Sequence, residues 1–514
     1  MTVTLIILGL AWRTLRYLLA FPYWGDESFV VVSFLTRDFA GMIRPLEWGQ
    51  IVPLGFMWAD LVMARLFGVG EHALRFIPYV AGVASLFLFW RLATQHLPKR
   101  AALLAVGFLA ASFYAVRHGA EAKAYSTDLL VALALIHLAW AVWTHPRSAP
   151  RWAALCLGGL LAPWCSYPAL FVGGAIGILL SWMLLRERFA GGVLAGWFGF
   201  GLLFVASSLL MIFLYAVPHA RAASGLTEIE MWRMAFPPWD RPWMLPVWLV
   251  AIHTGMMFAY PHGGHWGGST FTFVVFVIGA VWMWRRNRPL VVLLLAALPL
   301  NFIAASFEKY PYGGTVRTSL YLAPAICLLA GAGLYALLRR FLKGEQLRLG
   351  LMVASGAFAV LAVGGMIGDV ARPYATEHSI ISYRHVRDIA HATRPQDRWA
   401  TFNAVEPCDY APWLGAWRGI GGQWVFDMLR FCPTREPIQW APPPEALEVP
   451  ADGTLWLFCY RGIKVAFPEN QWQAYLDAVT SRLGSPEHES RRIKQRDGVW
   501  ESIEIYRWDG RNQR

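Results

Sequence analysis

Residues 24–28 read Trp24-Gly25-Asp26-Glu27-Ser28 and place two adjacent carboxylates a few residues after the first apolar segment, residues 3–21. Acidic residues are scarce over residues 1–368, which hold 14 Asp and Glu against 27 Lys and Arg. Ionisable groups near a lipid core are costly, so the positions of these few acids point to function. The pair Asp26 and Glu27 is the reference point for the rest of the chain.

The composition predicts a polytopic membrane protein with room for one soluble domain. Of the 514 residues, 57% are hydrophobic and 15% are charged, and the mean hydropathy is positive. A soluble enzyme of this size does not carry so many apolar runs. The net charge is +12, but residues 369–514 hold 18 Lys and Arg against 19 Asp and Glu. The basic excess belongs to the membrane part, so it indicates topology and no nucleic-acid partner is expected.

The first apolar segment, interrupted by Arg13 and Arg16, is interpreted as a transmembrane helix. A signal peptide is the alternative, but the basic start and the small-residue cleavage site of such a peptide are missing. The segment is short at its start, so we expect a few further residues upstream. Ten more spans are expected at residues 73–95, 101–117, 124–143, 152–167, 168–185, 193–217, 270–284, 289–305, 318–338 and 349–367.

The apolar segment 244–260 decides the topology. If it crossed the membrane, the basic cluster at residues 285–288 would lie outside, whereas a re-entrant or interfacial segment puts this cluster inside with the other basic turns. We therefore predict eleven spans in a membrane domain of residues 1–368, within the plasma (inner) membrane. The loops 22–72 and 218–269 and the domain 369–514 then face the periplasm. Within the loop 22–72, amphipathic runs at residues 29–39 and 52–67 are expected to lie along the interface.

The C-terminal region, residues 369–514, has a mixed pattern that predicts a small α/β domain. Residues 382–391 and 470–483 have helical patterns, and residues 453–460 have the pattern of a strand. Cys408 and Cys432 are a candidate disulfide in this exported domain, which would leave Cys459 free. No cysteine spacing indicates a zinc site, and no glycine-rich nucleotide-binding motif is present.

Polar side chains are expected to converge on the outward side of the membrane. If a helix begins near residue 119, Glu121, Tyr125 and Asp128 share one face of it, and Lys123 points away toward the headgroup layer. The alternative is that these charges only anchor helix ends. The predicted cluster consists of Asp26, Glu27, Glu47, Glu121, Lys123, Asp128, Glu308, Lys309 and Arg317.

Carboxylates combined with fixed cations at a membrane surface suit glycosyl transfer from a polyprenyl-phosphate sugar. A carboxylate can deprotonate the acceptor hydroxyl, while Lys or Arg stabilises the phosphate leaving group. The aromatic residues Tyr23, Trp24 and Trp48 could stack on a sugar, although they also fit an interfacial aromatic belt.

A series of motifs strengthens this interpretation. Leu8-Gly9-Leu10-Ala11-Trp12-Arg13 runs into the acidic stretch, and further motifs follow at residues 45–56, 66–75, 121–128 and 310–317. In this order they resemble GT-C glycosyltransferases related to protein O-mannosyltransferases, the lipid A aminoarabinose transferase and the rhizobial galacturonosyltransferase-like group. The resemblance covers most of residues 5–338, whereas the C-terminal domain shows no motif of the family.

The resemblance implies an inverting transferase with a periplasmic site. Asp26 would be the general base, Glu27 its positioning neighbour and Asp128 a second-loop acid. Lys123, Arg317 and Arg13 would hold the phosphate of the lipid donor. Some family members bind a divalent metal and others do not, so a metal is left open. Further substrate contacts are assigned to Glu47, Glu121, Tyr125 and Tyr310.

Two other functions are weighed against this one. A transporter or lipid flippase should carry its charges near the membrane midplane on broken helices of an inverted repeat, and no repeat is visible. A non-catalytic envelope scaffold would not need Asp26, which could then simply cap the following helix. The sequence does not identify the sugar or the lipid length. It also leaves open whether the acceptor is a lipid, a glycan or a protein.

Overall fold

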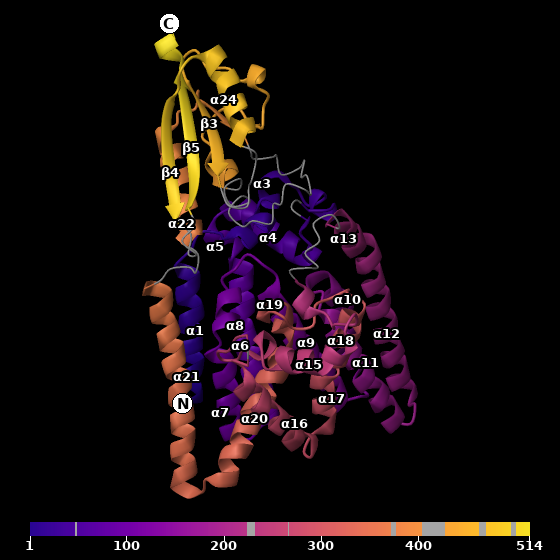
Figure 1. Ribbon diagram of the computed structural model, residues 1–514. Helices are drawn as coiled ribbons and strands as arrows, with labels where there is room; N and C mark the ends of the chain where they lie inside the picture. The colour runs from indigo at the N-terminus through magenta and orange to yellow at the C-terminus, as the bar shows by residue number, and fades with distance from the viewer. Residues whose placement is uncertain are drawn as a thin grey trace.

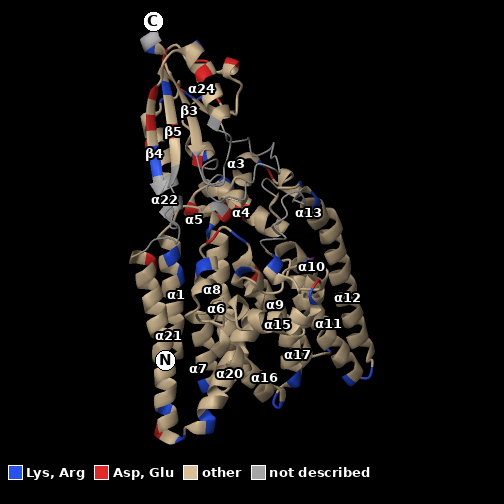
Figure 2. Cartoon of the chain, viewed as in Figure 1, with Lys and Arg blue, Asp and Glu red and all other residues tan. Residues whose placement is uncertain are grey.

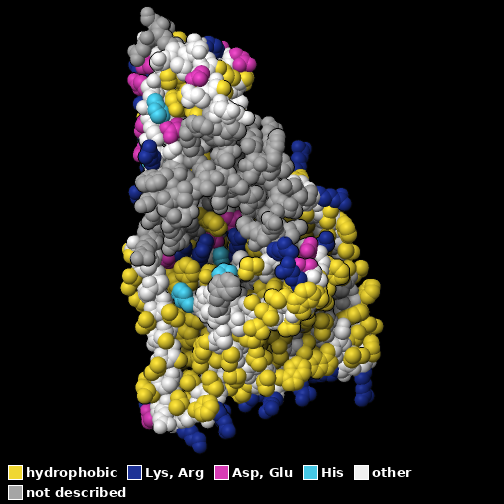
Figure 3. Space-filling model, in the orientation of Figure 1, with side chains coloured by type: hydrophobic (Ala, Val, Ile, Leu, Met, Phe, Trp, Pro, Cys, Tyr) yellow, Lys and Arg dark blue, Asp and Glu magenta, His cyan; other side chains and the backbone are white. Residues whose placement is uncertain are grey.

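Two parts make up the fold, a bundle of helices and a smaller domain built on a β-sheet (Figure 1). The computed structural model describes residues 1–46, 49–223, 232–265, 267–371, 377–402, 427–461, 469–494 and 500–513. The bundle presents an apolar surface over most of its height (Figure 3). The sheet domain lies beyond one end of the bundle and carries the C-terminus.

Within the described residues, seven helical segments are long and apolar enough to cross a membrane. They are α6 (Phe76–His96), α9 (Tyr125–Thr144), α11 (Ala169–Arg186), α12 (Gly191–Met211) with η3 (Ile212–Ala216) and α13 (Val217–Ala223), α17 (Arg288–Leu295) with α18 (Ala297–Ser306), α19 (Val316–Ser319) with η7 (Leu320–Leu322) and α20 (Ala323–Phe341), and α21 (Gly344–Ala371). The other four predicted spans are also helical but shorter, and they are α1 (Thr2–Leu18), α7 (Lys99–Ala110), α10 (Ala149–Cys165) and α16 (Thr270–Trp284). The protein is a multi-pass membrane protein, as predicted, while the number of eleven spans stays a prediction.

Helix α20 lies at the centre of the bundle and packs against α16 and α7. Close approach to α16 depends on two glycines, because a Cβ at Gly279 would lie 1.8 Å from the carbonyl oxygen of Leu329 and a Cβ at Gly333 1.7 Å from that of Val275. Small residues at such a crossing let helix backbones approach closely within a membrane. The tight contact fixes α20 and, through η7, the short helix α19 that carries Arg317.

The segment that decides the topology contains the helix α15 (Leu245–His253), flanked by η5 (Pro242–Met244) and η6 (Met256–Phe258). A helix of 9 residues is roughly 14 Å long, about half of the ~30 Å hydrocarbon core. With its flanking 3-10 helices the apolar segment runs over Pro242–Phe258, and the expectation that it does not cross stays a prediction. Arg and Lys side chains gather at the end of the bundle opposite the sheet domain (Figure 2).

The loop that follows α1 forms a layer between the bundle and the sheet domain (Figure 1). It contains α2 (Gly25–Val31), α3 (Ser33–Thr36), α4 (Leu54–Phe67) and α5 (Glu71–Leu74). These helices have an apolar core of their own, to which Val30, Phe34, Met57, Leu61 and Leu74 contribute. Other short 3-10 helices of the chain are Gly41–Ile43, Arg233–Ala235, Pro444–Ala446 and Gly510–Gln513.

The C-terminal domain contains a five-stranded sheet in the order β2-β1-β3-β5-β4. Its elements are α22 (Glu377–Ala392), β1 (Arg398–Thr401), β2 (Gln439–Trp440), β3 (Thr454–Arg461), α24 (Glu469–Leu483), β4 (Glu487–Lys494) and β5 (Trp500–Asp509). Strand β1 pairs in parallel with β2 and β3, whereas β5 pairs antiparallel with β3 and β4. The two helices and the strand predicted for this region are confirmed as α22, α24 and β3.

Alternate residues of β3 point to opposite faces of the sheet, so the domain has two cores. Trp456 and Phe458 pack with Val386 of α22, while Leu457 packs with Trp472 of α24. Cys432 forms no disulfide with another described residue, and Cys408 lies outside the described residues. The pairing of these two cysteines therefore stays a prediction.

Candidate active site

The acidic pair lies in the first turn of α2, the helix that follows α1 in the chain after a short connection. The N-cap residue of α2 is Trp24, and the side chain of Glu27 accepts a hydrogen bond from the Trp24 backbone N–H at 3.3 Å. Acidic residues are favoured in the first turn because they complement the helix dipole. The capping contact belongs to Glu27, so the alternative interpretation of Asp26 as a helix cap is wrong.

Asp26 is held between two cations from distant parts of the chain. Its Oδ2 accepts a hydrogen bond from Arg317 Nη1 at 2.6 Å, and its Oδ1 lies 3.3 Å from Lys123 Nζ. The Asp26 side chain remains 24% exposed, so it is open to a substrate. Burial works to raise the pKa of Asp26, but Lys123 and Arg317 outweigh it and hold this pKa below its usual 3.8.

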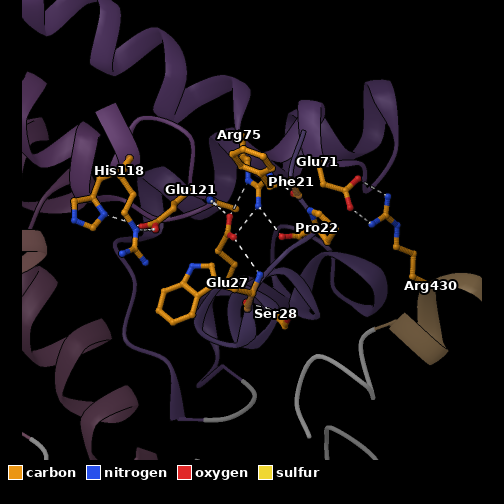
Figure 4. A network of polar contacts seen from close by, with 12 residues as sticks. Phe21, Pro22, Glu27, Ser28, Glu71, Arg75, His118, Glu121 and Arg430 are labelled. Carbon is orange, nitrogen blue, oxygen red and sulfur yellow. Dashed lines mark hydrogen bonds and ion pairs between the residues drawn. The ribbon is translucent and has the colours of Figure 1, made fainter. Parts of the chain in front are cut away.

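Glu27 is fully buried and has a partner for each carboxylate oxygen (Figure 4). Oε1 accepts hydrogen bonds from Arg75 Nε at 2.9 Å and from the Ala122 backbone N–H at 2.7 Å. Oε2 accepts hydrogen bonds from Arg75 Nη2 at 2.7 Å and from the Trp24 backbone N–H. Adjacent residues thus have different surroundings, since Asp26 is accessible and Glu27 is locked in place.

The second loop differs from the predicted helix start. Helix α8 (Phe113–His118) is followed by a non-helical turn, and α9 begins only at Tyr125. Because residue 123 lies in this turn, the expectation that Lys123 points to the headgroup layer is wrong. Lys123 is 5% exposed, and it also donates a hydrogen bond to Gln50 Oε1 at 2.8 Å. Burial lowers the pKa of Lys123, although Asp26 opposes this.

Glu121 anchors the turn that carries Lys123 (Figure 4). Its carboxylate bonds Arg117 Nε and His118 Nδ1, both at 2.7 Å. Burial alone would raise the pKa of Glu121, but Arg117 and His118 bring it well below 4.5. The Arg117 guanidinium also lies over the ring of Trp24, 5.5 Å from its centroid. Glu121 therefore couples the second loop to the first.

Asp128 lies in the first turn of α9 and is 6% exposed. Its Oδ1 has no hydrogen-bond partner among the described residues. Tyr125 interacts electrostatically with Asp128, Asp26 and Arg317. Tyr310 interacts electrostatically with Asp128, and its hydroxyl donates to the carbonyl oxygen of Thr318 at 3.0 Å, next to Arg317. Asp128, Tyr125 and Tyr310 therefore lie in the same region as Asp26, within the range of electrostatic interaction.

One predicted site residue, Arg13, does not join this cluster. Arg13 is buried between α1 and α7, where it donates hydrogen bonds to the carbonyl oxygens of Gly9 (2.9 Å), Leu109 (3.2 Å) and Ala110 (3.4 Å). The carbonyl groups at the end of α7 have no partner within the helix, and Arg13 satisfies them. The prediction that Arg13 holds the donor phosphate at the site is therefore wrong. Glu47 lies outside the described residues.

Arg75, Arg117 and Trp232 belong to the site but were not among the predicted site residues. The ring of Trp232 lies 4.9 Å from the Arg317 guanidinium. Arg75 and Arg117 lie at the outward ends of the predicted spans 73–95 and 101–117, where the positive-inside rule makes arginine uncommon. That exception is the signal that could have identified them.

The donor set does not fit a divalent metal. Asp26, Glu27 and Glu121 are each paired with basic side chains, so a dication would have to displace these cations. Over the described parts of the chain, no group of three or more His, Cys, Asp or Glu residues is placed to hold a metal.

Comparison with known proteins agrees with the predicted class. Residues 52–211 match the family model described as dolichyl-phosphate-mannose-protein mannosyltransferase. The fold is similar to that of ArnT from Cupriavidus metallidurans bound to undecaprenyl phosphate, with a TM-score of 0.53 and 13% identity over 98% of this chain and 97% of that one. The apo form of the same ArnT gives a TM-score of 0.52 at 13% identity, over 97% of this chain and 96% of that one.

The likeness to an oligosaccharyltransferase from Archaeoglobus fulgidus is weaker. Its TM-score is 0.47 at 12% identity, covering 96% of this chain and 70% of that one. No curated protein matches the chain in sequence. The family match over residues 52–211 and the fold shared with ArnT confirm the predicted resemblance to GT-C membrane glycosyltransferases.

Proposed function

We propose that this protein transfers a sugar from a polyprenyl-phosphate-linked donor to a hydroxyl group of an envelope acceptor, with inversion and with Asp26 as the general base. The observation that carries the proposal is the accessible Asp26 carboxylate between the cations Lys123 and Arg317. One carboxylate with two cations supplies both functions that this reaction needs, a base and a phosphate site.

The chemical step is a single displacement. The oxygen of the acceptor hydroxyl bonds to the anomeric carbon of the sugar, and its proton passes to the Asp26 carboxylate. The bond between the anomeric carbon and the phosphate oxygen breaks, and the electron pair leaves with the polyprenyl phosphate. The lowered pKa of Asp26 keeps its carboxylate ionised, and therefore able to accept a proton, at neutral pH.

Lys123 and Arg317 are proposed to stabilise the phosphate. Arg317 uses one nitrogen for Asp26, and its Nε has no hydrogen-bond partner among the described residues. A guanidinium can bind two phosphate oxygens in a bidentate arrangement. The undecaprenyl phosphate bound by the ArnT relative supports a polyprenyl phosphate as the carrier.

The surroundings of Glu27 support inversion as part of the proposal. A retaining mechanism requires a second carboxylate that can reach the anomeric carbon as a nucleophile. Glu27 is fully buried, and both of its oxygens are bound by Arg75 and by backbone N–H groups. Glu27 is therefore proposed to position its neighbour and not to act as a nucleophile, in keeping with a single displacement at Asp26.

The remaining polar residues are proposed to contact the sugar and its acceptor. Asp128 has a buried carboxylate oxygen without a partner, which suits a sugar hydroxyl as hydrogen-bond donor. Tyr125 and Tyr310 lie close enough to interact with it electrostatically. Glu121 is already paired with Arg117 and His118, so it supports the second loop and is a weaker candidate for direct contact.

We place the reaction on the periplasmic side of the inner membrane. The site lies at the end of the bundle next to the sheet domain, whereas basic side chains mark the other end (Figure 2). Basic turns are retained in the cytoplasm. A transporter would need its charges near the membrane midplane, which this arrangement does not favour.

The test uses full-length protein in detergent with a panel of synthetic undecaprenyl-phosphate sugars and an extract of envelope lipids. Mass spectrometry would detect released undecaprenyl phosphate and the glycosylated acceptor. We expect turnover with at least one sugar, and its loss in Asp26→Asn. Wild-type protein that binds the donors without turning over any of them would contradict the proposal.

A further inference from the structure

Arg430 connects the C-terminal domain to the layer that carries Asp26 (Figure 4). Its guanidinium makes two hydrogen bonds to Glu71, at 2.6 Å and 2.8 Å. The two side chains are only 16% and 11% exposed. On the other side, the neighbouring Met428 is fully buried in the core between the sheet and α22. A bidentate pair of this kind holds two elements in one geometry.

The ring of Tyr23 makes a second contact with Arg430. It is 1% exposed, and its centroid lies 5.7 Å from the guanidinium carbon of Arg430 and 4.9 Å from that of Arg75. Cations at this distance from a desolvated ring are attracted to it. Tyr23 precedes Asp26 by three residues, so Arg430 contacts the start of the acidic stretch as well as α5.

Arg75 continues the series toward the site. It follows α5 directly, and its side chain donates hydrogen bonds to both oxygens of Glu27 and to the carbonyl oxygens of Phe21 and Pro22. Arg75 thus binds the chain on both sides of Tyr23, at the carbonyl groups of Phe21 and Pro22 and at the side chain of Glu27.

Glu27 connects Arg75 to the second loop. It accepts a hydrogen bond from the Ala122 N–H at 2.7 Å, and the next residue, Lys123, contacts Asp26. The path from Arg430 to Asp26 is a continuous series of contacts.

The charges along this path alternate in sign. Arg430 neutralises Glu71, and Arg75 neutralises Glu27. Without Arg430, Glu71 would be an uncompensated carboxylate that attracts Arg75, to which it is already coupled electrostatically. Arg75 would then bind Glu27 less firmly, and the backbone around Asp26 and Ala122 would become less well ordered.

We infer that Arg430 is a positioning residue for the reaction at Asp26, acting through Glu71, Tyr23 and Arg75. The inference rests on the proposed function in that it takes Asp26 as the base. It gives the C-terminal domain, which shows no motif of the family, a direct effect on the geometry of the site.

The test compares full-length Arg430→Met and Arg430→Lys with a matched control, Arg398→Met. Arg398 also makes a bidentate pair, with Glu436, but within the C-terminal domain. Hydrogen exchange would be followed in peptides covering residues 20–28 and 119–124, together with kcat, KM and the melting temperature.

For Arg430→Met we expect exchange at the Ala122 amide to rise about tenfold. We expect kcat to fall on the order of tenfold to a hundredfold, because small displacements of catalytic groups cost that much. KM for the donor should change less, and Arg430→Lys should recover part of the loss. Arg398→Met should leave both peptides and kcat unchanged.

Unchanged exchange in both peptides of folded Arg430→Met would overturn the inference, as would raised exchange with normal kcat. If Arg430→Met does not fold, Arg430→Lys and Glu71→Gln decide by the same measurements. Full turnover in Asp26→Asn would instead defeat the proposed function, and the exchange data would still decide whether Arg430 orders the site.

Discussion

Replacing Asp26 by Asn separates the two functions proposed for this site, base catalysis by Asp26 and phosphate binding by Lys123 and Arg317. Asn keeps the size of the side chain but cannot accept the proton of the acceptor hydroxyl. General-base catalysis contributes about a hundredfold to ten-thousandfold, so turnover should fall by that amount. Binding of undecaprenyl phosphate should respond in the opposite direction, because the carboxylate and the phosphate compete for Lys123 and Arg317.

The size of this gain in binding follows from the charges. Two like unit charges about 4 Å apart repel by about 1 kcal/mol when water screens them fully, which corresponds to roughly fivefold in Kd. We therefore expect Asp26→Asn to bind undecaprenyl phosphate about fivefold more tightly while it loses turnover.

Titration with undecaprenyl phosphate and the sugar-panel assay would measure both quantities. Asp240→Asn is a matched control, since Asp240 also lies near two arginines, Arg233 at 3.5 Å and Arg241 at 3.6 Å, but is 54% exposed. Near-normal turnover of Asp26→Asn would refute its role as base. Weaker lipid binding together with lost turnover would refute the competition between carboxylate and phosphate.

Three further predictions follow from the same geometry. Arg317→Ala should weaken binding of undecaprenyl phosphate about tenfold to a hundredfold, since a charge-assisted contact is worth about 1.5–3 kcal/mol. Arg317→Lys should restore only part of this affinity, and unchanged affinity in Arg317→Ala would make Arg317 a helix anchor. Lys123→Met removes a cation that lowers the pKa of Asp26, so this pKa should rise and the acid limb of the kcat–pH profile should move to higher pH; an unmoved limb would contradict the assignment. A cysteine at Gly453 should react with an impermeant reagent in intact cells and one at Asn287 should not, whereas labelling at Asn287 would contradict the eleven-span topology.

Several parts of the site could be predicted because charges are rare beside apolar spans. Asp26, Lys123 and Arg317 come from three separate connections between spans, and the structure places Lys123 Nζ and Arg317 Nη1 at 3.3 Å and 2.6 Å from the Asp26 carboxylate. No single local pattern required this convergence. It followed from placing three charged loops on the same side of one membrane, where each charge needs a partner.

The prediction of a helix start near residue 119 is wrong because side-chain ion pairs stabilise a turn at that point. Residues 119–124 have helical spacing, but the ion pairs of Glu121 with Arg117 and His118 hold a turn there. Lys123 consequently points to Asp26 instead of the headgroups. The prediction for Arg13 is wrong for another reason, since a charged residue within a span can satisfy backbone carbonyl groups of a neighbouring helix.

The structure also changes the expectation for Glu27. As a mere neighbour of the base it should tolerate Gln with a small loss, but Arg75 makes two hydrogen bonds to it in a fully buried pair. Breaking a buried ion pair by changing one partner typically costs about 3–5 kcal/mol. Glu27→Gln should therefore destabilise the acidic stretch, so its kinetics alone cannot separate catalysis from folding, and Asp26 is the cleaner position to test.

The balance of charge around the base gives a reason for the kind of donor that this site accepts. The ion-paired Asp, Glu, Lys and Arg residues around the base, Asp26 included, are four acids and five bases, namely Asp26, Glu27, Glu71 and Glu121 with Arg75, Arg117, Lys123, Arg317 and Arg430. His118, which also pairs with Glu121, is counted as neutral because burial lowers its pKa. With these acids and bases all ionised, the set carries one excess positive charge, located where Lys123 and Arg317 share a single carboxylate. A phosphodiester-linked sugar brings one negative charge and neutralises the set. The departing phosphate gains negative charge as the glycosidic bond breaks, so the same two cations bind it more strongly in the transition state than in the donor, as catalysis requires.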